Sequence, residues 1–152
     1  MFGFFKKEKK KKSPVPEYDA KLIKKFHKDH EKLVKQVTLI KKLVATNETA
    51  KAKQGLKKLK MELLGHFMEE DIKLYWYLKD YYRDSPDTIE TIKMFEETIK
   101  KIQKEVVAFL DYYAQENIKF DMVFDKEFNG IVEALSTRIA TEESSLYTLY
   151  IK

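Results

Sequence analysis

The stretch "GHFMEEDIKLYWYL" at residues 65–78 places a histidine four residues before a glutamate, His66 and Glu70, within a pattern typical of a helix core. The apolar residues around them recur every three or four positions, which is the spacing of one face of an α-helix. Residues four apart share a helix face, so this spacing turns both polar side chains toward the protein interior.

Three other segments have the same helical periodicity. The expected helices cover residues 19–46, 49–82 and 86–114 and a fourth segment after residue 120, with Ser85 as the N-cap and Pro86 in the first turn of the third helix. The links are short, and four glycines and three prolines are too few to punctuate a β-structure. The sequence therefore predicts an all-α fold, an up-down-up-down antiparallel four-helix bundle. We expect residues 1–16 to form a tail and residues 17–152 the bundle domain.

Each helical stripe is apolar except near its middle. The apolar members include Val37 on the first helix, Leu74 and Tyr77 on the second, and Leu146 and Leu149 on the fourth. The polar interruptions are His30 on the first helix, His66 and Glu70 on the second, Glu96 as one option on the third, and Arg138 and Glu142 on the fourth. Residues equally far from an antiparallel turn lie at the same height in a bundle. His30 and His66 are each 18 residues from a turn centred near Glu48. Similar counts from the other turns predict one buried layer of ionisable groups.

Such a layer must be satisfied either by a metal or by internal ion pairs. A metal would be held by His30, His66, Glu70 and Glu142, with Glu96 as a further carboxylate ligand. This mixture of nitrogen and oxygen donors suits iron, manganese or zinc. In the alternative, Arg138 stands where a cation would sit and neutralises Glu142 and Glu70, because a guanidinium stays protonated and cannot ligate a metal.

Three segments resemble the hemerythrin-like (HHE cation-binding) family over nearly the whole of residues 19–150. "KDHEKLVKQV" at 28–37 is similar to the family's first-helix histidine segment, "LLGHFMEEDIKLY" at 63–75 to its HxxxE segment, and "RIATEESSLYTLY" at 138–150 to its last-helix segment. The resemblance implies a hemerythrin-like bundle with a di-iron site that binds oxygen or senses oxygen or iron. Carried over by position, it implies His30, His66, Glu70 and Glu142 as ligands.

The sequence also departs from that family. Arg138 stands where the last helix usually has histidine, and the third helix has no histidine, since all three histidines of the chain precede residue 67. A full five-histidine site cannot be built, so we do not expect reversible oxygen carriage. The expectation is an incomplete di-iron site or a mononuclear iron site, or a bundle that holds no metal.

A second, weaker resemblance points to a different class of function. "GHF" at 65–67 and "EALSTR" at 133–138 are similar to the Rsd family of bacterial anti-sigma regulators, in which an arginine at position 138 is expected. This resemblance implies a metal-free four-helix module that binds a protein partner, the sigma factor of RNA polymerase. No nucleophile with an oriented base is visible, so the sequence does not predict an enzyme.

The basic character of the chain comes from its first residues. Six of the 30 basic residues lie within residues 1–12, beside Glu8, so 24 basic residues match 24 acidic ones in the rest. Because the body is balanced, we expect no nucleic-acid partner. Phe2, Phe4 and Phe5 precede Lys6 and Lys7, a pattern that fits either a disordered solubilising tail or a peripheral contact with anionic lipid.

The sequence also bears on location. No apolar run approaches the roughly 20 residues of a membrane span, and the chain has no cysteine. We therefore expect a cytoplasmic protein, with the tail as a peripheral contact to the inner face of the membrane under the second interpretation of that tail.

Overall fold

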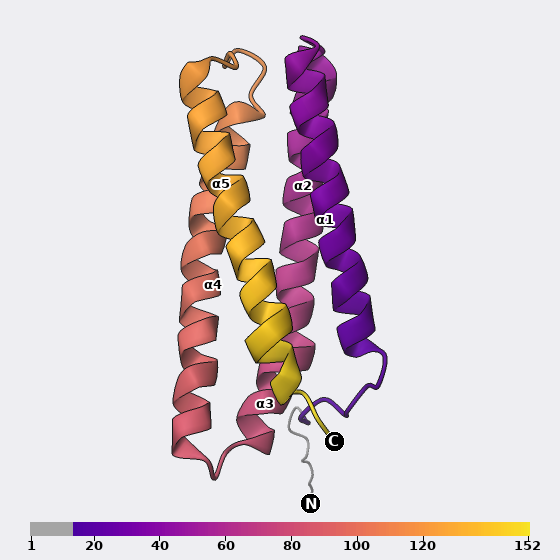
Figure 1. The fold of residues 1–152 in the computed structure, drawn as a ribbon, viewed down its shortest axis with the longest axis vertical. Coiled ribbons are helices and arrows are strands. Elements are labelled where there is room, and N and C mark those ends of the chain that lie inside the picture. Colours follow the sequence, from indigo (N-terminus) through magenta and orange to yellow (C-terminus); the bar gives the residue numbers. More distant parts are fainter. Residues whose placement is uncertain (1–13) are drawn as a thin grey trace, which may run out of the picture.

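The computed structural model describes residues 14–152, which form four helical rods (Figure 1). The tail residues considered for membrane contact, Phe2, Phe4, Phe5, Lys6 and Lys7, lie outside the described residues. The rods comprise α1 (Leu22–Ala45), then α2 (Thr49–Glu69) continued by the π-helical segment η2 (Glu70–Tyr75) and α3 (Trp76–Tyr81), then α4 (Pro86–Tyr113), and finally α5 (Met122–Thr141) continued by the π-helical segment η3 (Glu142–Leu146) and the 3-10 turn η4 (Tyr147–Leu149).

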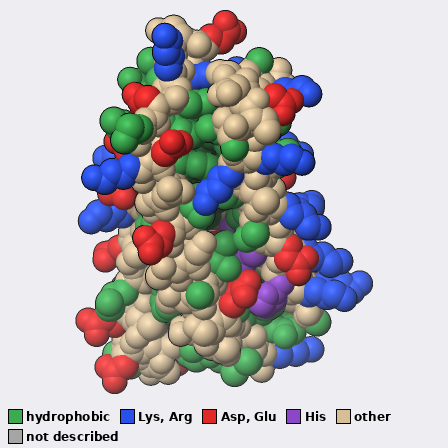
Figure 2. All heavy atoms as spheres, turned by 45° about the horizontal axis from the view of Figure 1, so that its top comes forward, with side chains coloured by type: hydrophobic (Ala, Val, Ile, Leu, Met, Phe, Trp, Pro, Cys, Tyr) green, Lys and Arg blue, Asp and Glu red, His purple; other side chains and the backbone are tan. Residues whose placement is uncertain are grey.

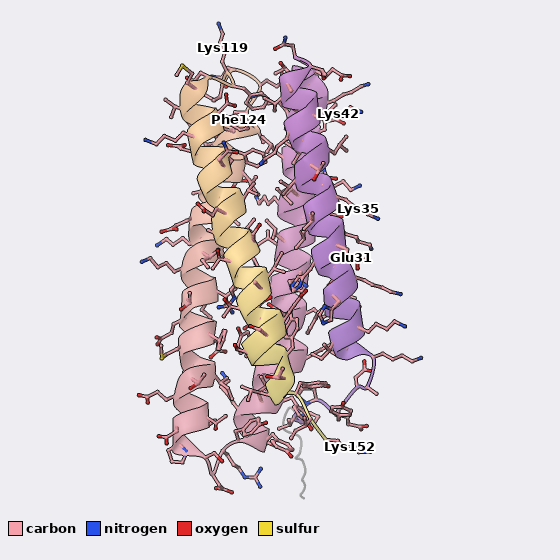
Figure 3. All side chains as sticks on the ribbon, in the orientation of Figure 1. Glu31, Lys35, Lys42, Lys119, Phe124 and Lys152 are labelled. Carbon is pink, nitrogen blue, oxygen red and sulfur yellow. The ribbon has the colours of Figure 1, made fainter. Side chains whose placement is uncertain are left out.

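Successive rods run antiparallel and are joined by short links, so the predicted all-α, up-down-up-down bundle is confirmed (Figure 1). The outer face of α1 carries Glu31, Lys35 and Lys42, whereas Phe124 turns inward from the start of α5 (Figure 3). Within residues 14–152, none of the helices combines the length and the apolar composition needed to cross a bilayer.

The ends of the helices follow from local hydrogen bonding. Pro86 is the first residue of α4 and Ser85 precedes it as predicted, although the Ser85 side chain makes no capping hydrogen bond. The start of α5 is capped instead by Asp121, whose carboxylate accepts a hydrogen bond from the Phe124 backbone N–H at 3.0 Å.

The first helix begins at Leu22, three residues later than predicted. The Asp19 carbonyl accepts from the Leu22 N–H, and its carboxylate accepts from the Lys21 N–H at 2.9 Å, which closes a turn before the helix. The Asp19 N–H donates to the Tyr150 hydroxyl at 2.7 Å, so this turn is fastened to the C-terminal end of the chain.

The two π-helical segments change which residues reach the core. Tyr77 and Leu149 belong to the predicted apolar stripes but are only half-buried, while Tyr75, Tyr147 and Tyr150 are buried. A π-helical turn is wider than an α-helical turn, so it rotates the residues that follow it relative to a strict 3.6-residue period. Past the start of these segments, the predicted stripes are confirmed at Leu74 and Leu146, which are buried, and only their last members, Tyr77 and Leu149, are half-buried.

The backbones of α1 and α2 approach closely at Gly55. Gln36, not the predicted Val37, is buried here, because its amide donates to the Gly55 carbonyl at 3.1 Å. A Cβ atom added at Gly55 would lie 2.9 Å from Cγ1 of Ile40, a fully buried side chain. The close packing of these two helices therefore requires a residue without a side chain.

We expect Gly55→Ala to destabilise the protein by about 1–3 kcal/mol, because overpacking outweighs the gain of about 1 kcal/mol in helix propensity. Gly65→Ala and Gly130→Ala are matched controls, since a Cβ at either position meets nothing within 4 Å. Urea denaturation should show both controls unchanged or stabilised. A Gly55→Ala variant as stable as the controls would mean that α1 and α2 separate without cost.

Candidate metal centre

The structure brings four of the residues predicted from the sequence into one buried cluster. His30 comes from α1 and His66 from the last turn of α2, while Glu70 and Glu142 are the first residues of the two π-helical segments. One ligand atom from each of the four lies within 4.8 Å of all the others. We call these residues the four-donor cluster.

The inner nitrogens of the two imidazoles face each other. The Nε2 atoms of His30 and His66 are 3.2 Å apart. His30 Nε2 is also 3.1 Å from a Glu142 carboxylate oxygen, and His66 Nε2 is 3.3 Å from a Glu70 carboxylate oxygen. Both nitrogens therefore point at the same small volume as the two carboxylates.

The outer nitrogens of both rings are held by two further carboxylates that the sequence did not reveal. Nδ1 of His30 is 2.7 Å from Glu143, and Nδ1 of His66 is 2.9 Å from Asp29. Because a carboxylate only accepts, each Nδ1 is the protonated nitrogen, and each Nε2 directs a lone pair inward. A carboxylate behind the imidazole is the usual support of a metal-ligating histidine.

Two inward lone pairs 3.2 Å apart repel each other unless a proton or a metal ion lies between them. Without metal, burial by itself lowers the pKa of His66, but its contacts with Glu70 and Asp29 outweigh that effect and raise the pKa to about 9. Burial likewise lowers the pKa of His30, and hydrogen bonds to Glu142 and Glu143 raise it above its ordinary value. The metal-free cluster therefore retains a proton where a cation would bind.

One carboxylate oxygen of the cluster is unsatisfied. Oε1 of Glu70 is buried and has no hydrogen-bond partner among the described residues. Burial raises the pKa of Glu70, and the nearby charge of Glu142 raises it further against the lowering effect of His66. A buried acceptor without a partner costs about 1–3 kcal/mol, so this oxygen is suited to a cation. The donor set of the cluster thus fits a metal ion.

Arg138 flanks the cluster with a permanent positive charge. Its Nε donates to Glu142 at 3.0 Å, its Nη2 donates to the Tyr75 hydroxyl at 2.7 Å, and the guanidinium lies 5.1 Å from the centre of the Phe95 ring. Burial would raise the pKa of Glu142, but the His30 hydrogen bond and the Arg138 charge hold it below its ordinary value. Arg138 contacts Glu142 directly, whereas the contacts of Glu70 are with His66 and Tyr147.

The structure does not place Glu96 in the cluster. Its carboxylate is half-buried and accepts two hydrogen bonds from Lys79, at 2.9 and 3.1 Å. Phe95 packs over Arg138 at this level of α4. In the described part of the chain, α4 therefore adds no donor to the four-donor cluster.

Tyr147 is a third residue at the cluster that the sequence did not reveal. Its hydroxyl donates to Glu70 at 2.6 Å and lies 3.1 Å from Glu142 and 3.2 Å from His30. It reaches the cluster because η3 rotates the end of the fourth rod. The last-helix segment contains both Tyr147 and Tyr150, and helical spacing alone does not say which of them reaches the cluster. π-Helical turns are frequent at functional sites.

Comparison with known families agrees with this geometry. Residues 21–150 match the family model described as the hemerythrin HHE cation binding domain. The chain belongs to the hemerythrin family, which confirms the resemblance inferred from the sequence. Searches of curated proteins and of solved structures found no match to the chain.

We expect Arg138→Leu to lower the free energy of unfolding of the metal-free protein by about 3 kcal/mol, because Glu142 would be left buried beside no fixed positive charge. Arg83→Leu is the control, since the Arg83 side chain is 66% exposed and pairs with Asp80 at the surface. That change should cost well under about 1 kcal/mol. Equal effects of the two changes in chemical denaturation would show that the layer is not organised around Arg138.

A pH dependence of stability follows from the raised pKa of His66, which is about 9 in the folded protein. A raised folded-state pKa adds stability that is complete below the unfolded value of about 6.5 and is lost as the pH rises through the folded value. We therefore expect the chelator-treated protein to lose about 2–3 kcal/mol between pH 6.5 and 9.5. In urea titrations, His66→Gln should lose less over the same interval, and an equal loss would assign the effect to other groups.

Proposed function

We propose that this protein binds a single metal ion, iron or manganese, through His30, His66, Glu70 and Glu142. The observation that carries the proposal is the pair of inward-facing Nε2 atoms 3.2 Å apart, each on a ring whose Nδ1 is held by a carboxylate. The unsatisfied Glu70 oxygen supports the same proposal. Two imidazoles with two carboxylates form a donor set that these metals accept.

A single ion is proposed in place of the di-iron site that the family resemblance implied. In residues 14–152, α4 contributes no donor to the cluster, and Arg138 takes the last-helix position at which the family usually has histidine. Its guanidinium is 3.0 Å from Glu142, so a second cation at that carboxylate would face a fixed positive charge. The proposed site is therefore mononuclear.

An apolar cavity of about 160 Å³ gives small molecules access to the cluster. It lies between α1, α2 and α5, and its wall includes His30, His66 and Glu142 beside Leu33, Leu63 and Leu135. Figure 2 shows hydrophobic side chains recessed between neighbouring helices, with histidine side chains below them. Apolar cavities of this size admit small apolar molecules. A bound iron would supply a redox-active centre, so we propose that the protein senses iron or oxygen species.

Metal content is the direct test. We expect the anaerobically purified protein, reconstituted with iron(II) or manganese(II), to hold one equivalent per chain by mass spectrometry. Its melting temperature should rise on loading and fall again with a chelator, because a ligand that binds only the folded state stabilises it. His66→Gln and Glu142→Gln should each lose the bound metal.

Glu96→Gln is the matched control for Glu142→Gln, because Glu96 pairs with Lys79 and lies outside the cluster. It should bind metal as the unaltered protein does. Two equivalents per chain would restore the di-iron interpretation. A protein that binds no metal would overturn the proposal. The cluster would then be a metal-free layer with the Arg138–Glu142 ion pair, as in the alternative of a bundle that binds a protein partner.

A further inference from the structure

The hydroxyl of Tyr147 contacts three of the four residues of the four-donor cluster. Its Oη is within 2.6–3.2 Å of a donor atom of Glu70, Glu142 and His30. The side chain is 4% exposed, so the phenol is held in the protein interior. A phenol carries one proton and can donate to only one of these three neighbours at a time. When the phenol donates to Glu70, its 3.1 Å contact with the ionised Glu142 carboxylate has no proton between the two oxygen atoms.

The spacing of these atoms is that of neighbouring ligands around one metal ion. Two ligand atoms about 2.1 Å from a metal and at a right angle to each other are about 3 Å apart. Three separations among the four-donor cluster are 3.1, 3.2 and 3.3 Å. Two separations from Tyr147 Oη, 3.1 Å to Glu142 and 3.2 Å to His30, fall in the same range, and the third, 2.6 Å to Glu70, is a short hydrogen bond. Tyr147 therefore extends the donor set by one position.

We infer that Tyr147 is a fifth ligand, which binds the metal through its phenolate oxygen. The inference rests on the proposed function, because it names a further ligand of the same ion. On coordination the metal replaces the phenolic proton, which leaves to solvent, as ligand deprotonation accompanies metal binding generally. Phenolate is an oxygen donor that iron accepts in proteins. It supplies a donor to a site that has only two histidines.

Tyr75 provides an internal comparison for Tyr147. Tyr75 follows Glu70 by five residues, as Tyr147 follows Glu142, and both side chains are buried. The Tyr75 hydroxyl, however, accepts a hydrogen bond from Arg138 and so faces a cation instead of the donors. The two tyrosines share their local setting and differ in what their oxygens contact.

The opposite arrangement has a distinct outcome. If the Tyr147 hydroxyl filled the metal position of the metal-free protein and moved away on binding, it would compete with the metal. Removing it would then strengthen binding, whereas removing a ligand weakens binding. The direction of the change in affinity separates the two arrangements.

The experiment compares the unaltered protein with Tyr147→Phe and Tyr75→Phe. Affinity is measured by anaerobic titration with manganese(II), and visible absorption is recorded after iron loading and oxidation to iron(III). We expect a visible phenolate-to-iron(III) charge-transfer band in the unaltered protein and in Tyr75→Phe. Tyr147→Phe should lose the band and bind manganese at least about tenfold more weakly.

Resonance Raman excitation in that band should enhance tyrosinate vibrations in the unaltered protein, a result that does not depend on the folding of any variant. One bound metal without the band, or a Tyr147→Phe variant that binds as tightly or more tightly, would overturn the inference and leave the proposed function standing. An unaltered protein that binds no metal would overturn both.

Discussion

The centre of this bundle is governed by the approach of two imidazole nitrogens. Two lone pairs 3.2 Å apart in a buried space cannot remain without a positive charge between them. The rings have little freedom to turn away, because Asp29 and Glu143 hold their outer nitrogens. The packing of α1 against α2 therefore favours a proton or a metal ion between these two nitrogens. The carboxylates, the arginine and the buried tyrosine around them determine how strongly that positive charge is held.

Proton and metal are alternatives at this place, and charge balance explains why. A protonated His66 and Arg138 offset the charges of Glu70 and Glu142, so these four groups can be neutral together without metal. A divalent ion bound as proposed would displace the proton and use the same carboxylates as ligands. The fold can therefore persist with either occupant, and the affinity for metal depends on how strongly the proton is held. Arg138 contributes to both states, because it pairs with Glu142 and keeps that group ionised.

Much of this architecture could be predicted from the sequence, because helical periodicity and counting from turns depend on averages over many residues. The four helices and the common level of His30, His66, Glu70, Arg138 and Glu142 were obtained in that way. Features that depend on a single backbone turn could not be predicted from the sequence. The π-helical segments that bring Tyr75 and Tyr147 inward are the main examples. The supporting roles of Asp29 and Glu143 were missed because adjacent residues on a helix point in different directions, and only the packing decides their partners.

The two halves of the chain repeat one spacing of buried polar residues, and each half contacts residues of the other. His66, Glu70 and Tyr75 are followed in the second half by Arg138, Glu142 and Tyr147 at the same intervals. Tyr75 reaches across to Arg138, and Tyr147 reaches back to Glu70. Neither helical hairpin can therefore satisfy its own buried polar groups, and each would expose an incomplete set if it formed alone. The hairpins are thereby obliged to fold and unfold as one cooperative unit.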